Sequence, residues 1–208
     1  MIELYHCPDA RSFRCLWLLE ELGLPYRLHQ LAFPPRFKAP DYLQRHAIGT
    51  VPLLIDGDET LFESAAILQY LSTRNGPTSL AVSADEPGYA SHLNWLHFGE
   101  ASLATHLAVM LRYAIFEPEA KRLPQVVEFY RGVVAERLQL LASALEGQDY
   151  LSAGRFTIAD ISVGYSLMLS RLLGLHKSWP PALHAYWDRL RERPAFTAAK
   201  QAQQPAAN

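Results

Sequence analysis

The sequence predicts two structural parts, an α/β domain at the N-terminus and an all-helical domain after it. Three observations support this prediction. Strand-like and helical segments alternate up to about residue 75, breaker residues gather over residues 75–87, and helical periodicity alone follows them. We therefore expect a domain over residues 1–76, a linker over 77–87, a helical-bundle domain over 88–200 and a flexible tail over 201–208.

The elements of the first domain can be assigned in chain order. The expected strands share alternating or β-branched residues and cover residues 2–5, 26–31, 51–55 and 60–62. The last two flank Asp56-Gly57-Asp58, a typical hairpin turn. Helical spacing begins at Phe13 and ends at Gly23. The proline-containing residues 33–38 are expected to form a non-helical loop, and a second helix is expected over residues 65–74.

The second domain contains only helical patterns. They cover residues 89–116, 119–145, 158–173 and 181–193. Thr157 and Asp160 have the spacing of a capping box, so we interpret this pair as structural, and Asp160→Ala should impair folding rather than catalysis. His92, His97 and His106 share one helical region, but they lack the i, i+4 pairing of a metal motif, and we expect no metal site.

Composition restricts the class of function. The 208 residues are 50% hydrophobic with a formal net charge of −2, which suits a packed core and argues against a nucleic-acid partner. No apolar run approaches the roughly 20 residues that cross a bilayer, and the N-terminus lacks the layout of a signal peptide. Two cysteines do not make a disulfide framework. We expect a cytoplasmic protein with no membrane partner.

The first motif that suggests chemistry is Gly49-Thr50-Val51-Pro52. A proline at the start of a strand removes a ladder donor. A cis Val51–Pro52 bond would turn the backbone of Val51 outward, where an extended peptide can add to it as a strand. An ordinary trans proline is the alternative, since only about 5–6% of X–Pro bonds are cis.

The second motif is Glu63-Ser64, where a strand passes directly into a helix. The hydroxyl and N–H of Ser64, together with the helix N-terminus, form an anion site, and Glu63 beside them can accept a hydrogen bond from an ammonium group. This combination suits the head group of an α-amino acid. Ser64 is also expected to act as the N-cap of the helix.

These motifs, together with the opening Leu4-Tyr5-His6, Arg14 and the run from Leu18 to Tyr26, resemble the cytosolic glutathione transferase family. The resemblance covers essentially the whole chain. It implies a thioredoxin-like N-terminal domain, an all-helical C-terminal domain and a homodimer. It also implies that glutathione is the co-substrate, that a small apolar electrophile is the second substrate, and that no metal takes part.

The resemblance assigns glutathione contacts to the residues that match the motifs of the family. Val51, after which Pro52 begins the strand, would pair with the cysteinyl backbone of glutathione, and Glu63 and Ser64 would hold the γ-glutamyl group. Many relatives carry a basic or amide side chain where this chain has Thr50. Lys38 or His46 is therefore expected to supply a contact to the glycine carboxylate.

The catalytic position is expected in the loop from His6 to Arg14, and two alignments compete there. Serine-type members carry their active serine four residues before the arginine that matches Arg14, and Ala10 occupies that place; Ser12 is the nearest hydroxyl. Cysteine-type, omega-like members match the run from Cys7 to Arg14 in full. We place Cys7 ahead of Ser12 as the catalytic candidate, while a small buried hydrophobic role is its alternative.

Three functions are consistent with these residues. The first is conjugation of the glutathione thiolate to an apolar electrophile. The second is glutathione-dependent thiol transfer or dehydroascorbate-type reduction through a mixed disulfide at Cys7. The third is a non-catalytic glutathione-binding protein, since a fold does not fix a function. Cys15 lies within the first helix, where we expect a core position, so no two-cysteine redox pair is predicted.

Overall fold

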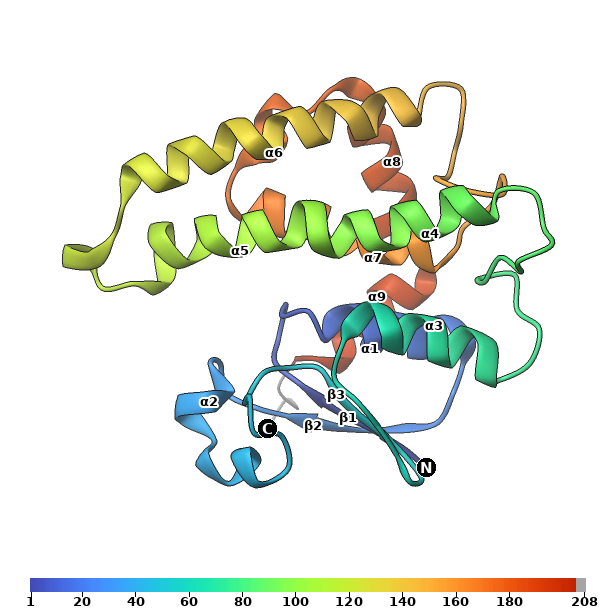
Figure 1. Cartoon of the computed structure of the whole chain (residues 1–208), viewed down its shortest axis with the longest axis horizontal. Coiled ribbons are helices and arrows are strands. Elements are labelled where there is room, and N and C mark those ends of the chain that lie inside the picture. Colours follow the sequence, from blue (N-terminus) through green and yellow to red (C-terminus); the bar gives the residue numbers. More distant parts are fainter. Residues whose placement is uncertain (205–208) are drawn as a thin grey trace. The chain divides into compact units, whose positions relative to one another are not determined.

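A computed structural model describes residues 1–204 of the chain (Figure 1). The described chain divides into two compact units. The first unit comprises Met1–Ala81 and the C-terminal segment that starts at Arg191, and the second comprises Val82–Leu190. The first unit holds all the named strands and the second is built from helices, which confirms the expected fold class.

The first unit is built on a four-stranded mixed sheet. Its strands are β1 (Ile2–His6), β2 (Tyr26–Gln30), β3 (Leu53–Asp56) and β4 (Glu59–Leu61). They lie in the order β2-β1-β3-β4, with β1 and β2 parallel and the other pairs antiparallel. The parallel pair requires a crossover, which α1 (Phe13–Leu22) supplies. The helices α1 and α3 (Ser64–Arg74) lie on the same side of the sheet (Figure 1).

The helix α1 begins and ends where the sequence predicts. Its residues from Phe13 to Leu19 are buried, and Gly23 ends it with a left-handed backbone at φ 60°. Such a conformation suits glycine because other residues pay a steric cost for it. The amide of Gly23 donates to the carbonyls of the last turn, so the end of the helix is satisfied.

Two sequence predictions about the first unit are wrong. Residues 33–38 were expected to be non-helical, but Pro35–Lys38 form one helical turn, α2, with Pro35 at its first position. Proline is compatible with that position because no hydrogen bond is required of its nitrogen there. In addition, the helical pattern that was expected to end at Arg193 is followed by a further helix, α9 (Pro194–Ala202).

The helix α9 belongs to the first unit and packs against α1. The ring of Phe196 lies edge-on to the rings of Phe13 and Trp17, at centroid distances of 5.4 and 4.9 Å. The helix includes Gln201, and the side chain of Gln203 is buried just beyond its end. The expected flexible tail is therefore wrong for residues 201–203, whereas its last four residues lie outside the described part of the chain.

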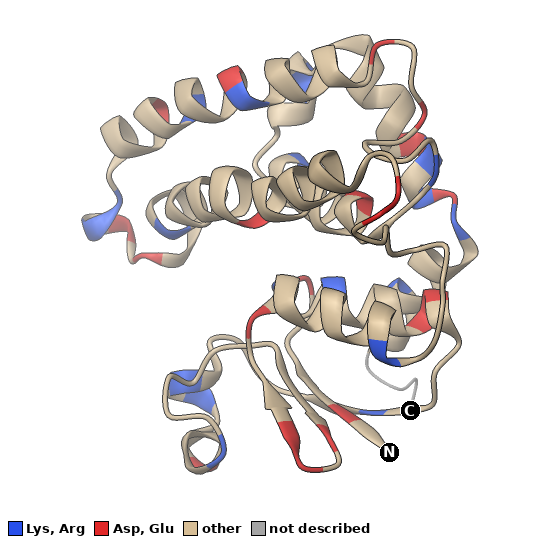
Figure 2. Cartoon of the chain, turned by 45° about the vertical axis from the view of Figure 1, so that its right-hand side comes forward, with Lys and Arg blue, Asp and Glu red and all other residues tan. Residues whose placement is uncertain are grey.

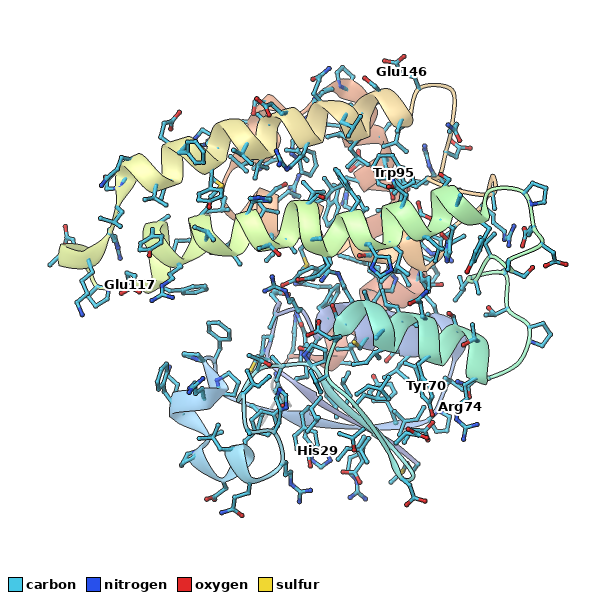
Figure 3. The ribbon with its side chains drawn as sticks, in the orientation of Figure 1. His29, Tyr70, Arg74, Trp95, Glu117 and Glu146 are labelled. Atoms are coloured by element: carbon cyan, nitrogen blue, oxygen red, sulfur yellow. The ribbon has the colours of Figure 1, made fainter. Side chains whose placement is uncertain are left out.

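Polar and charged side chains connect α3 with the end of β3. In Figure 3, Tyr70 and Arg74 lie together near the end of α3, and Asp56 of β3 accepts from both, at 3.0 Å from the Tyr70 hydroxyl and 3.5 Å from Arg74 Nε. Acidic and basic residues are interspersed along the ribbon of each unit in Figure 2, consistent with the small net charge.

The second unit consists of helices, among which α7 (Ile158–Leu172) is buried over most of its length and packs against α4 (Tyr89–His97). The other helices are α5 (Thr105–Leu111), α6 (Pro124–Ala144) and α8 (Pro181–Arg191). Wider π-type turns cover Phe98–Ala104 and Arg112–Phe116. No helix in the described part of the chain has the length and apolarity that crossing a membrane requires.

The π-type segment after α4 is stabilised by serines of α7. The hydroxyls of Ser162 and Ser166 donate to the carbonyls of Leu96 and Gly99, each at 2.7 Å. A Cβ atom at Gly99 would lie 2.4 Å from Ser162 Oγ, so this close approach requires glycine. The side chains of α7 thereby donate hydrogen bonds to carbonyls at the start of the π-type segment and just before it.

The capping box at the start of α7 is present as the sequence predicts. Asp160 Oδ2 accepts from the amide of Thr157 at 2.8 Å, and the hydroxyl of Thr157 accepts from the amide of Ala159. Asp160 Oδ1 also accepts from the amide of Leu151 at 3.1 Å and from the hydroxyl of Tyr186 at 2.8 Å. Burial raises the pKa of Asp160 to about 6 despite these donors.

We predict that Asp160→Ala lowers the free energy of unfolding by about 3 kcal/mol, because several buried donors lose their acceptor at once. Urea unfolding followed by circular dichroism measures the change. Asp149→Ala is the control: Asp149 pairs with Arg189 at 2.9 Å but its side chain is 75% exposed, and we expect a change below about 1 kcal/mol. Equal losses in both variants would contradict the structural role of Asp160.

Candidate functional site

Apart from Lys38 and His46, the residues predicted for the site lie on three segments of the first unit. They are the loop between β1 and α1, which we call the β1–α1 loop (residues 7–12), the residues just before β3, and the start of α3. Arg14 links two of them, because its fully buried guanidinium donates from Nη1 to Ser64 Oγ at 3.2 Å. The first turn of α1 and the first turn of α3 are therefore held together.

The segment before β3 leaves Val51 outside the sheet ladder, which begins at Leu53. The Val51–Pro52 peptide bond is cis. The side chain of Val51 is buried in a small cluster with Tyr5, Cys7, Tyr42 and Leu53. Its neighbour Thr50 is exposed, and the Thr50 carbonyl accepts from the Tyr42 hydroxyl at 2.7 Å. The buried side chain of Val51 and the hydrogen bond to the Thr50 carbonyl together fix the backbone at Val51.

The start of α3 differs in one respect from the sequence prediction. Glu63 is the N-cap residue, Ser64 is the first helical residue, and no side chain caps the helix. The prediction that Ser64 is the N-cap is therefore wrong. Its hydroxyl accepts from Arg14 instead, and the early amides of the helix keep their capacity to bind an anion. Glu63 is exposed beside them while Ser64 is buried.

The candidates for a carboxylate contact have different surroundings. His46 Nε2 lies 3.0 Å from Thr50 Oγ1, and the His46 ring is buried between aromatic neighbours that include Phe62 at 5.1 Å. Burial lowers the pKa of His46, while the carboxylate of Glu63 acts in the opposite direction. Lys38 is exposed at the end of α2. The structure thus connects Thr50 with His46 directly.

Cys7 has the surroundings of a core residue. Its side chain is fully buried in the cluster with Val51 and Tyr42, and burial raises the pKa of its thiol to about 11. A thiol with that pKa is protonated at neutral pH, whereas nucleophilic attack requires the thiolate. Cys15, also fully buried, has its pKa raised for the same reason. Both cysteines are free thiols.

Ser12 is also fully buried, and its hydroxyl does not cap α1. Ser12 Oγ lies 2.8 Å from Nδ1 of His6 and accepts from the amide of Cys7 at 3.3 Å. Both contacts lie within the β1–α1 connection itself. The hydroxyl of Ser12 therefore holds the ends of this loop together.

The His6 ring extends this connection to the C-terminal end of the first unit. It is fully buried, and burial lowers its pKa to about 4, so the ring is neutral at pH 7. Its Nε2 lies 3.2 Å from Oε1 of Gln203, a residue that the sequence analysis assigned to a flexible tail. Gln203 also contacts Asp9, and so does Lys200 of α9. A small polar tail carries no motif, so sequence reasoning did not identify these contacts.

The histidines of the second unit do not gather into a metal site. His92 is buried with Nδ1 at 3.5 Å from the Ser152 hydroxyl, and His106 Nδ1 lies 2.9 Å from the Ser102 carbonyl. Among the described residues, no group of three or more His, Cys, Asp or Glu side chains is arranged to hold a metal ion.

We predict that His6 remains neutral down to about pH 4 in the folded protein and titrates near pH 6.5 when unfolded. Because the unfolded state then binds the proton more readily, this group stabilises the fold above pH 6.5, and the contribution of about 3 kcal/mol is lost between pH 6.5 and 4. A proton NMR titration, with His6 assigned through a His6→Asn variant, measures the folded pKa. A midpoint near 6.5 in the folded protein would contradict the burial argument.

Comparison with known proteins identifies the family to which the chain is similar. The family model of the glutathione S-transferase N-terminal domain matches residues 1–73. Glutathione S-transferase 4 of Zea mays is 30% identical over 199 residues, which cover 90% of this chain and 86% of the maize protein. The disulfide-bond oxidoreductase YfcG of Escherichia coli is 28% identical, with 94% of this chain and 92% of that protein covered.

The fold comparison gives the same result over nearly the whole chain. The solved structure of a sphingomonad glutathione S-transferase complexed with glutathione matches this chain with a TM-score of 0.83 and 26% sequence identity. That match covers 97% of this chain and 98% of the other. On the strength of its fold, its site segments and this full-length similarity, the chain belongs to the glutathione S-transferase family.

Proposed function

We propose that this protein is a glutathione transferase that conjugates the thiolate of glutathione to an apolar electrophile. The observation that supports this most directly is the start of α3, where Ser64 does not act as the N-cap and the exposed carboxylate of Glu63 stands next to it. Donors for a carboxylate and an acceptor for an ammonium group are thereby adjacent, as an α-amino acid head group requires.

Glutathione is proposed to bind along the first unit in an extended conformation. Its γ-glutamyl carboxylate contacts the Ser64 hydroxyl and the first amides of α3, while its ammonium group contacts Glu63. Its cysteinyl backbone pairs with Val51, which lies outside the sheet ladder. Its glycine carboxylate lies toward Thr50 and the adjacent His46, with Lys38 as the second candidate.

The thiol of glutathione is proposed to lie at the β1–α1 loop, where the positive end of α1 favours the thiolate. The buried, protonated state of Cys7 supports conjugation over a mixed disulfide at that residue. The engaged hydroxyl of Ser12 supports a structural role in shaping the loop. Cys7 and Ser12, the two predicted catalytic candidates, are thus proposed to be buried structural residues of the loop that do not contact the reacting sulfur.

A second candidate function is glutathione-dependent disulfide reduction. It is favoured by the similarity to a relative named disulfide-bond oxidoreductase. We propose that such a reaction would proceed at the sulfur of glutathione rather than at Cys7. A homodimer, a cytoplasmic location and a role in detoxification are further proposals that the resemblance to the family supports.

We predict that Ser64→Ala weakens glutathione binding by roughly 1–3 kcal/mol, because a hydrogen bond to a charged group is lost. Isothermal titration calorimetry with glutathione measures the change. Ser72→Ala is the matched control, since Ser72 is a buried serine on the same helix whose hydroxyl bonds to the Gln69 carbonyl. Unchanged affinity in Ser64→Ala would refute the placement of the γ-glutamyl group.

We predict that Cys7→Ala retains conjugation of a generic aromatic electrophile to within about threefold of the wild-type kcat/KM, because a buried, protonated thiol makes no contact with the transition state. Loss of a transition-state contact of about 1.4 kcal/mol would instead lower kcat/KM tenfold. Cys15→Ala, a second buried cysteine of the same unit, controls for the loss of core volume. A drop of a hundredfold or more in Cys7→Ala alone would show that Cys7 is catalytic. Thiol transfer from a mixed disulfide, measured in parallel, tests the second candidate function.

A further inference from the structure

The end of α9 forms a hydrogen-bonded connection to the β1–α1 loop that the proposed chemistry leaves unexplained. Gln203, 5% exposed, lies at its centre. Its Oε1 accepts from the amide of Asp9 at 3.1 Å, and its Nε2 donates to Asp9 Oδ1 at 2.7 Å. Its own carbonyl accepts from the Gln30 side chain at the end of β2. Gln203 therefore joins α9, the loop and the sheet.

The two contacts to Asp9 fix which end of the Gln203 amide faces which neighbour. A backbone N–H can only donate and an ionised carboxylate can only accept, so Oε1 must face the Asp9 amide and Nε2 its carboxylate. The Oε1 atom, an acceptor, is also the atom that lies 3.2 Å from Nε2 of His6. His6 Nε2 must therefore carry a hydrogen and donate it to Gln203.

This assignment determines the rest of the connection. The neutral His6 ring carries one N–H, and when this is at Nε2 the other nitrogen, Nδ1, is an acceptor. The Ser12 hydroxyl at 2.8 Å then donates to Nδ1 and uses its lone pairs to accept from the amide of Cys7. A chain of hydrogen bonds thus runs from Ser12 to His6 and from His6 to Gln203, and each residue donates to the next.

The backbone conformation of Asp9 is a second feature that the contact with Gln203 stabilises. Its backbone has φ 56°, the left-handed conformation that a residue with a side chain seldom adopts. Asp9 is exposed on the solvent side of the loop, and two residues at the C-terminal end of the first unit contact it: Gln203 through the Asp9 amide and carboxylate, and Lys200, whose Nζ lies 2.6 Å from Oδ1. The loop conformation between Cys7 and Ser12 is accordingly held from both ends.

We propose that Gln203 is a positioning residue for the reaction at the β1–α1 loop: its side-chain amide holds Asp9 in place and sets the tautomer of His6, which in turn holds the Ser12 hydroxyl and so fixes the loop conformation. This inference rests on the proposed function, which places the glutathione sulfur at this loop. It predicts that Gln203 affects the chemical step more than the binding of glutathione, because the proposed contacts of the tripeptide backbone lie at Val51, Glu63 and Ser64.

The experiment compares Gln203→Met, which retains the length of the side chain without its amide, with Gln201→Met in the last turn of α9, where the side chain is exposed. Conjugation kinetics are measured with glutathione varied, and the His6 tautomer is read from nitrogen-15 NMR of the ring. We expect Gln203→Met to lower kcat about tenfold with the KM for glutathione within twofold, and to populate the Nδ1–H form of His6. Gln201→Met should match the wild type in every readout.

A second variant, Gln203→Glu, keeps the acceptor that faces His6 but places a carboxylate against Asp9. We expect it to retain the Nε2–H tautomer while kcat still falls, which separates the two contacts and covers the case in which Gln203→Met does not fold. A wild-type tautomer in Gln203→Met, or a wild-type kcat in both variants, would overturn the proposal. Wild-type protein that binds no glutathione would instead overturn the proposed function, while the tautomer readout would still decide the assignment of His6.

Discussion

Burial of the first turn of α1 is the constraint on which the first unit depends. The side chains of Ser12, which precedes the helix, and of Arg14 in its first turn are fully buried. A buried donor or acceptor without a partner would lower the stability of the fold by about 1–3 kcal/mol. Each is therefore paired with a different part of the unit. Ser12 bonds to His6 at the end of β1, and Arg14 bonds to Ser64 at the start of α3. Pairing within the core thereby sets the relative positions of three segment ends.

The same constraint explains why the site residues are where they are. Ser64 bonds to Arg14 and does not cap its own helix, so the first amides of α3 remain available for an anion. The Thr50 carbonyl is held by Tyr42 just before the backbone reaches Val51. The groups proposed to bind glutathione are thus backbone atoms and side chains at the ends of fixed segments. Such local groups can recognise a small peptide without a large net charge on the protein.

In the second unit, buried polar groups are paired in a comparable way around α7. Asp160 accepts four hydrogen bonds from three residues of the unit. Two serines of the same helix donate hydrogen bonds to the carbonyls of Leu96 and Gly99. The capping box was predictable because both partners lie within one turn of sequence. The serine contacts were not, because they join residues more than sixty positions apart.

Local sequence determined the order of strands and helices, the ends of α1, the hairpin, the capping box and the segments of the site proposed for glutathione. Each of these depends on residues close in the chain, such as Gly23 after a helix or Asp56-Gly57-Asp58 between strands. Tertiary structure alone decided that Pro35 starts a helical turn, that Ser64 bonds to Arg14, and that Cys7 is a core thiol. It also decided that Gln203 contacts His6, 197 positions away, because burial and long-range hydrogen bonds depend on which segments the fold brings together.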